Sequence, residues 1–234
     1  MAGYSTRLPL SPYQFKASPY SSHARVLELL PTVTNGARVL DVGCGPGYLC
    51  ELLTARGYRV TGLEKAGWGP PDGPRGYALI DADLDRGLPS MDARFDVIVC
   101  ADVLEHLRDP AALLRQLRGV LAPGGRLIAS LPNSGHLYFR LVTLSGRFPK
   151  LDKGLFDRTH IHFFTWDGWC ALFTAAGFRI RTAIPTSVPV DLALNADSEA
   201  GAVRAAEWIS YRLARLRKQL FAYQFVVEAF RAEE

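Results

Sequence analysis

Apolar runs and amphipathic segments alternate along the middle of the chain. The apolar runs are short and continuous, which is typical of parallel strands covered on both faces. The segments between them place apolar residues at helical spacing, several with a capping residue before them and a glycine after. The pattern predicts strands at 37–42, 58–63, 77–80, 95–100, 126–131, 178–184 and 221–230, and helices at 21–30, 48–56, 110–121, 166–176 and 198–219. This alternation predicts an α/β fold with a doubly wound, mostly parallel sheet.

Three segments depart from the alternation. Residues 1–20 are rich in Pro, Ser and Tyr, and we expect an irregular arm. Residues 132–164 mix Gly, Pro, aromatic and charged residues and are expected to form an irregular cap, while 185–220 form a second insert. The length suits one α/β domain, so 1–234 is predicted to be a single domain around a core at 21–131.

Composition and charge exclude several classes of protein. Hydrophobic residues make up 48% of the chain, which indicates a globular rather than a disordered protein. The net charge of +4 is too small to argue for a nucleic-acid partner, and the basic residues at 204–218 are expected to form a solvated face. No apolar run approaches the ~18 residues of a membrane span, so we expect no membrane partner. Four cysteines without metal-binding spacing, and no apolar leader, indicate a cytoplasmic protein.

A glycine-rich turn follows the first predicted strand. The run Val39-Leu40-Asp41-Val42-Gly43-Cys44-Gly45-Pro46-Gly47 places glycines where a ligand can approach the backbone closely, next to the start of a helix. In open α/β sheets ligands bind beyond the carboxyl ends of the strands. Glu64, at the end of the second strand, can accept hydrogen bonds from two ribose hydroxyls. The turn therefore predicts a nucleotide-like ligand.

A dinucleotide is the obvious alternative. Its G-x-G-x-x-G fingerprint requires glycine at position 48, where this chain has Tyr48. The observed spacing is G-x-G-x-G, which argues against a nicotinamide-dependent dehydrogenase.

The run VLDVGCGPGYL resembles motif I of class I methyltransferases that depend on S-adenosyl-L-methionine (SAM). The resemblance continues through Glu64, the Asp83-Leu84 pair, FDVIVCADVLEHLRDP at 95–110 and LAPGGRLIASLPN at 121–133. Within the class the chain is similar to the branch of ubiquinone-biosynthesis O-methyltransferases and natural-product enzymes. The resemblance implies a seven-stranded, Rossmann-like sheet of order 3-2-1-4-5-7-6 with its last strand antiparallel. The segments 132–164 and 185–220 would then form the acceptor side.

The resemblance also implies a set of SAM-binding residues. Gly43, Gly45 and Gly47 would line the methionyl and ribose parts, and Asp41 would lie near the ammonium group. The others are Glu64 for the ribose diol, Asp83 and the Leu84 amide for the adenine, and Ala101 for the methionine moiety.

Histidines are the candidate bases, because imidazole titrates near neutrality and a hydroxyl acceptor must lose a proton. His160 and His162 stand at i, i+2 in an expected extended segment, which would put both on one side of the chain, and His160 is the first choice. His106, Tyr138 and Phe164 are candidate acceptor-binding residues. For each histidine a purely structural hydrogen-bonding role remains the alternative.

A metal hypothesis rests on Asp102-x-x-Glu105-His106. On a helix these side chains would share one face, and His162 could complete a divalent-cation site. Similar acidic and histidine sites occur in ubiquinone O-methyltransferases and small-RNA 2′-O-methyltransferases. The Glu-His pair also recurs in relatives without metal, so no metal is assigned.

The sequence thus predicts methyl transfer from SAM to an oxygen or nitrogen of a small molecule, in secondary metabolism. Two alternatives stay open: an enzyme acting on RNA or a peptide, and a non-catalytic SAM-binding partner protein. Neither the acceptor nor the oligomeric state can be read from the residues.

Overall fold

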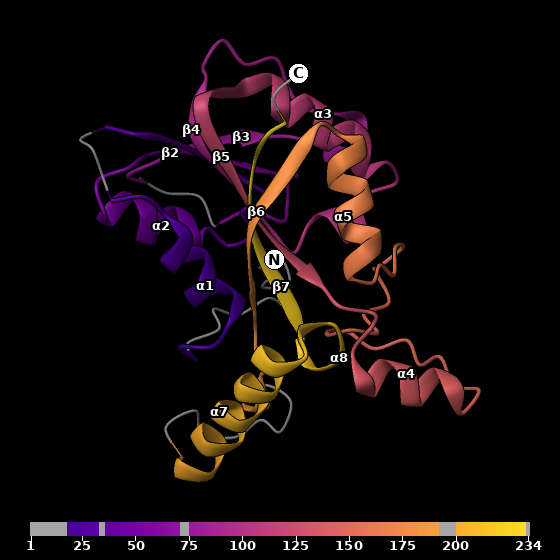
Figure 1. Ribbon diagram of the computed structural model, residues 1–234. Coiled ribbons are helices and arrows are strands. Elements are labelled where there is room, and N and C mark those ends of the chain that lie inside the picture. Colours follow the sequence, from indigo (N-terminus) through magenta and orange to yellow (C-terminus); the bar gives the residue numbers. More distant parts are fainter. Residues whose placement is uncertain (1–17, 33–35, 71–74, 192–199, 233–234) are drawn as a thin grey trace, which may run out of the picture.

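The computed structural model describes residues 18–32, 36–70, 75–191 and 200–232. Seven strands in these residues form one sheet of order β3-β2-β1-β4-β5-β7-β6 (Figure 1). The pairs are parallel except those that β7 makes with β5 and β6. The strands are β1 (Arg38–Val42), β2 (Arg59–Glu64), β3 (Ala78–Asp81), β4 (Phe95–Ala101), β5 (Leu121–Pro132), β6 (Phe178–Pro185) and β7 (Gln224–Arg231). The predicted fold class and strand order are confirmed.

Helices cover both faces of the sheet (Figure 1). On one face lie α1 (Ser22–Leu29) and α2 (Tyr48–Ala55), whose side chains share a core with Val39 and Val97. On the other lie α3 (Pro110–Val120) and α5 (Trp166–Ala175), which pack on Leu40 and Ile98. Successive residues of β1 and β4 thus point to opposite faces and are buried on both, which explains the continuous apolar runs.

Three further helices in the described part of the chain lie outside these layers. They are α4 (Leu137–Leu144), α7 (Gly201–Leu216) and α8 (Lys218–Phe221). The helix α4 corrects the expectation that 132–164 is irregular throughout. Its N-terminus is capped by His136, whose Nδ1 accepts a hydrogen bond from the Tyr138 amide. The buried Phe139 stacks on Phe156 with ring centroids 4.5 Å apart, so tertiary packing overrides the weak helical signal.

Three element boundaries in the described residues differ from the prediction by more than one residue. The strand β5 begins at Leu121, five residues early, because Leu121 already pairs with Phe95 before the register shifts. The helix expected to run to 219 ends at Leu216, since Arg217 leaves the helical conformation with φ −140°. The residues that follow form α8, which delays β7 to Gln224. The predicted helix start at Ser198 lies outside the described residues.

The end of the N-terminal arm packs on the second insert. Ser18 Oγ donates a 2.6 Å hydrogen bond to the buried Glu207 of α7, and Tyr20 stacks on Tyr211 at 4.7 Å. The other arm aromatics, Tyr4, Tyr13 and Phe15, lie outside the described residues. The arm and the insert therefore meet beside the carboxyl ends of the strands, where β5 and β6 end and β7 begins.

Candidate active site

The loop after β1 has an unusual backbone. Gly43, Gly45 and Gly47 have φ values of +68°, +51° and +86°, a region that side chains disfavour. A Cβ at Gly43 would lie 2.6 Å from Val103, and one at Gly47 would lie 2.2 Å from the Tyr77 hydroxyl. At Gly45, in contrast, no atom of the described residues lies within 4 Å of that position. Side chains therefore pack against both ends of the loop, whereas the space beside Gly45 is open and leaves room for a ligand.

Backbone hydrogen bonds hold the loop against β2. The amides of Gly43 and Cys44 both donate to the Leu63 carbonyl, at 2.8 and 3.0 Å. The next residue of β2, Glu64, accepts a 2.7 Å hydrogen bond from the Gly45 amide through Oε2. Its other oxygen accepts from the Lys65 amide at 2.8 Å. The Glu64 carboxylate is thus fixed beside the open side of Gly45.

Asp41 lies beneath this loop and is 1% exposed. Burial raises its pKa to about 7, the charge of Glu64 adds to the rise, and a hydrogen bond from the Cys50 thiol opposes it. The thiol lies 3.3 Å from Asp41 Oδ2. A buried carboxyl group that titrates near neutrality is typical of a ligand site rather than of a structural core.

Asp83 and Leu84 follow β3 at the same edge. Asp83 caps the short 3₁₀ helix Leu84–Arg86, and its Oδ2 lies 3.0 Å from Lys65 Nζ. The hydrogen bond from Lys65 lowers the pKa of Asp83. Ala101, half-buried, ends β4 on the other side of β1. The SAM residues expected from the sequence therefore come from the carboxyl ends of β1, β2, β3 and β4, which are neighbours in the sheet.

The residue after β4, Asp102, has φ +56° and is the one non-glycine residue with positive φ in the described parts of the chain. Ser130 Oγ and Gln224 Nε2 donate to its Oδ1, at 2.5 and 2.6 Å. Strained backbone held by buried partners often marks a functional site. Asp102 is not on a helix with Glu105 and His106, so the predicted shared helical face is wrong: only Leu104–His106 forms a 3₁₀ turn.

Glu105, His106 and His160 form a cluster beside this turn. Their ligand atoms all lie within 4.8 Å of one another. His160 Nε2 is 3.9 Å from Glu105 Oε1, with the two side chains 8% and 1% exposed, and the two imidazole rings are 4.7 Å apart. Burial, with His106 adding to its effect, lowers the pKa of His160 to about 4, so the ring is neutral near pH 7. A neutral imidazole beside a carboxylate, as at His160, can accept a proton or bind a divalent cation.

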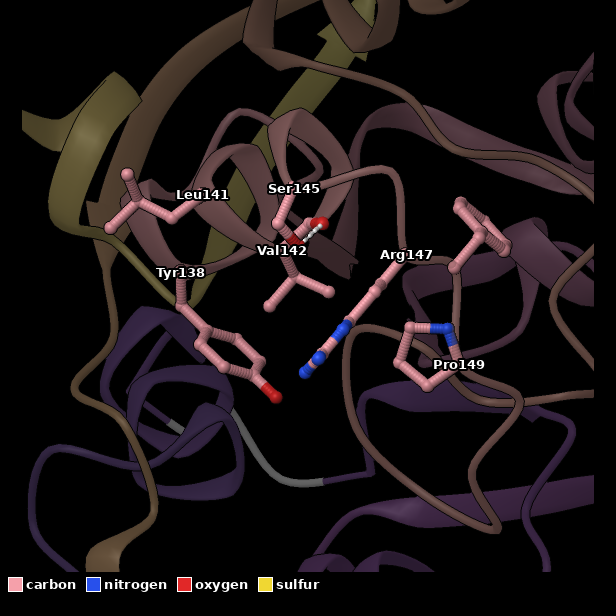
Figure 2. A pocket seen from close by; sticks show the side chains of 7 residues that line it. Tyr138, Leu141, Val142, Ser145, Arg147 and Pro149 are labelled. Carbon is pink, nitrogen blue, oxygen red and sulfur yellow. Dashed lines mark hydrogen bonds between the residues drawn. The ribbon is translucent and has the colours of Figure 1, made fainter.

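The other sequence candidates lie elsewhere. His162 does not join the cluster: its Nε2 is 2.9 Å from the Leu107 carbonyl, and its ring stacks on Phe164 at 5.3 Å. Phe164 also contacts the buried Trp169 and belongs to the packing of the main core. Tyr138 is 51% exposed and lines an apolar cleft of about 610 Å³ beside α4, where Figure 2 shows it extending toward Arg147. Of the three acceptor candidates, only His106 adjoins His160.

A small cavity of about 10 Å³, room for about one water molecule, lies next to Gln224 and was not predicted. It is lined by hydroxyl, amide and carboxyl side chains, among them Ser21, Ser22, Thr186, Ser187, Asp191, Tyr223 and Gln224. Gln224 connects it to Asp102, and Ser187 Oγ is buried without a hydrogen-bond partner among the described residues. These residues are far apart in the sequence, and only the antiparallel insertion of β7 beside β5 brings them together.

Comparisons with known proteins agree with this geometry. Residues 16–183 match the family described as "Methyltransferase domain". The chain is 32% identical over 161 residues to the ubiquinone biosynthesis O-methyltransferase of Aeromonas salmonicida, covering 62% of this chain and 64% of that protein. It is 38% identical over 122 residues to the same enzyme of Xylella fastidiosa, covering 49% of each. The matches thus span about half to two thirds of these relatives.

A solved structure supports the fold. Magnesium protoporphyrin IX methyltransferase from Synechocystis PCC 6803, with bound S-adenosylhomocysteine (SAH), superposes with a TM-score of 0.58 at 19% identity, over 90% of this chain and 82% of that one. The sheet order and the glycine loop define a SAM-dependent methyltransferase of class I. This chain belongs to the methyltransferase-domain family, whose methyl donor is SAM. Among the described residues, no helix is long and apolar enough to cross a membrane.

Proposed function

We propose that this protein transfers the methyl group of SAM to an oxygen or nitrogen atom of a small-molecule acceptor. The observation that carries the proposal is the position of the Glu105–His160 pair. Glu105 follows β4, whose neighbour β1 ends in the open glycine loop, and the His160 side chain lies beside Glu105. The similarity to ubiquinone biosynthesis O-methyltransferases supports an oxygen acceptor.

The residues present fit SAM. The open side of Gly45 offers space, Glu64 offers acceptors to ribose hydroxyls, and the buried Asp41 offers a partner for an ammonium group. When bound, SAM supplies an electrophilic sulfonium methyl group. What remains for the protein is to align the acceptor with that methyl group, exclude water and remove a proton.

His160 is the proposed base. In the reaction with a hydroxyl acceptor, the new carbon–oxygen bond forms as the carbon–sulfur bond breaks, and the hydroxyl proton passes to His160. Glu105, 3.9 Å from Nε2, stabilises the imidazolium that results.

A metal-assisted form of the same reaction is the second candidate. It is favoured by the three ligand atoms of Glu105, His106 and His160 within 4.8 Å. In that form these residues would hold a divalent cation, which supplies a Lewis acid for a hydroxyl acceptor.

The test is release of SAH with a panel of catechols, phenols and amines, beside RNA and peptide pools. We expect turnover with one of the small molecules, and transfer only to RNA or peptide would contradict the proposal. His160→Gln should lower kcat at least ~100-fold with unchanged SAM affinity, whereas His162→Gln, the matched control, should keep kcat. Loss of turnover in EDTA with rescue by Mn²⁺ or Zn²⁺ would select the metal-assisted form.

A further inference from the structure

The helix α7 exposes an apolar stripe. Ile209, Leu213 and Leu216 stand at i, i+4 and i+7 and are 52%, 40% and 76% exposed. Trp208 beside them is 51% exposed. The opposite face of the helix is buried against the molecule through Val203, Glu207 and Ala214. The stripe is therefore not part of the core, and its exposure needs an explanation.

The helix α4 repeats the arrangement. Leu137, Leu141 and Leu144 have the same i, i+4, i+7 spacing and are 36%, 56% and 84% exposed. Phe139 lies on the buried side of the helix. In Figure 1 both α4 and α7 project beyond the sheet at the same end of the molecule.

Positive charge is concentrated around both stripes. The segments 137–153 and 201–221 contain nine basic and two acidic residues, which gives them a net charge of +7. Because the whole chain has a net charge of +4, the remaining residues have a net charge of −3. The basic residues are Arg140, Arg147, Lys150, Lys153, Arg204, Arg212, Arg215, Arg217 and Lys218. Arg212 lies over the Trp208 ring, 5.7 Å from its centroid.

We propose that the exposed faces of α4 and α7 dock this protein peripherally on an anionic lipid surface. Leucines and a tryptophan on one helical face can enter the boundary between headgroups and acyl chains. The flanking arginines then reach the lipid phosphates along their apolar stems. This proposal departs from the expectation of a merely solvated basic face and of no membrane partner, and it does not depend on the methyl-transfer proposal.

A second copy of the chain or a nucleic acid fits the exposed faces of α4 and α7 less well than an anionic bilayer. A second copy meeting α7 with α7 would bring ten Arg and Lys side chains together, because 201–221 holds five in each chain. A nucleic acid would contact the arginines but would leave the exposed leucines without apolar partners. An anionic bilayer satisfies both the charge and the apolar stripes.

The test uses the full chain and flotation with two kinds of vesicle, phosphatidylcholine alone and phosphatidylcholine mixed with phosphatidylglycerol. We expect flotation with the mixed vesicles only and its loss at high salt. Arg215→Glu should lower the partition coefficient roughly tenfold, and Leu213→Glu should lower it as well, through loss of apolar contact. The matched controls, Arg115→Glu and Leu52→Glu on exposed positions of α3 and α2, should float like the wild type.

Tryptophan fluorescence gives an independent readout. A blue shift on adding mixed vesicles should disappear in Trp208→Phe and persist in Trp68→Phe, which changes another exposed tryptophan. Three results would overturn the proposal: no binding to mixed vesicles, binding that the α7 variants leave unchanged, or a dimer in solution that Leu213→Glu dissociates. Retention on RNA with none on vesicles would assign the surface to nucleic acid instead.

Discussion

Glu64 Oε2 and the Gly45 amide are joined by a 2.7 Å hydrogen bond, which ties the end of β2 to the loop after β1. The carboxylate is thereby held in place before any ligand arrives. Preorganisation of this kind reduces the cost of ordering a binding group. Because the position of the Glu64 carboxylate is fixed, substituting this residue tests its role in binding directly.

Glu64→Gln should weaken SAH binding at least tenfold, because a charged acceptor for two hydroxyls contributes roughly 1.5–3 kcal/mol. Glu51→Gln, on an exposed position of α2, is the matched control and should bind SAH like the wild type. Titration calorimetry measures both. Equal affinity for the two variants would remove Glu64 from the site.

Asp41→Asn should stabilise the protein at pH 8 while weakening SAM binding. The folded pKa of about 7 exceeds the ordinary 3.8, so the folded state prefers the protonated acid. Its contribution to stability is therefore lost as pH rises from 3.8 through 7, at a cost of the order of a few kcal/mol. We expect a higher urea midpoint for the variant at pH 8 and equal midpoints at pH 4. A variant less stable than the wild type at pH 8 would contradict this account of the buried carboxyl group.

His136→Asn should reduce the acid sensitivity of the fold. Burial lowers the pKa of His136 from 6.5 to about 4, so its contribution to stability is complete above pH 6.5 and is lost as pH falls toward 4. That loss can reach about 3 kcal/mol for one residue. Asparagine still caps the helix α4 but does not titrate. Urea unfolding at pH 7 and pH 4.5 should show a smaller fall in the free energy of unfolding for the variant than for the wild type. Protonation of His160 should cause part of the fall that the variant still shows. An unchanged fall would show that His136 is not responsible.

The sheet and the conformation of the glycine loop could be predicted from the sequence because both depend on local patterns. Apolar runs fix the strands, and glycines at 43, 45 and 47 with Glu64 fix the loop, whatever the rest of the chain does. The strand order itself came from the resemblance to a family.

The arrangement of side chains around His160 could not be predicted in the same way. The choice between His160 and His162 depends on the backbone: His160 closes a turn with Asp157, and the amides of Ile161 and His162 both donate to the Glu105 carbonyl. These long-range contacts separate two histidines that an extended segment would put together. The helix α4 was missed for a similar reason, since its aromatic and β-branched residues favour a strand until Phe139 packs on Phe156. The Asp102–Gln224 hydrogen bond spans 122 residues and has no local signal.

The most direct test of the account compares arginine substitutions at two glycines in one calorimetric titration with SAH. Gly45 and Gly124 both have positive φ, +51° and +71°, and no described atom lies within 4 Å of a Cβ at either, so the backbone cost is matched. Only Gly45 faces the proposed SAM site. We predict that wild type and Gly124→Arg bind SAH with one site per chain and that Gly45→Arg does not bind it. Equal binding by Gly45→Arg and Gly124→Arg would contradict the assignment of the glycine loop as the cofactor site.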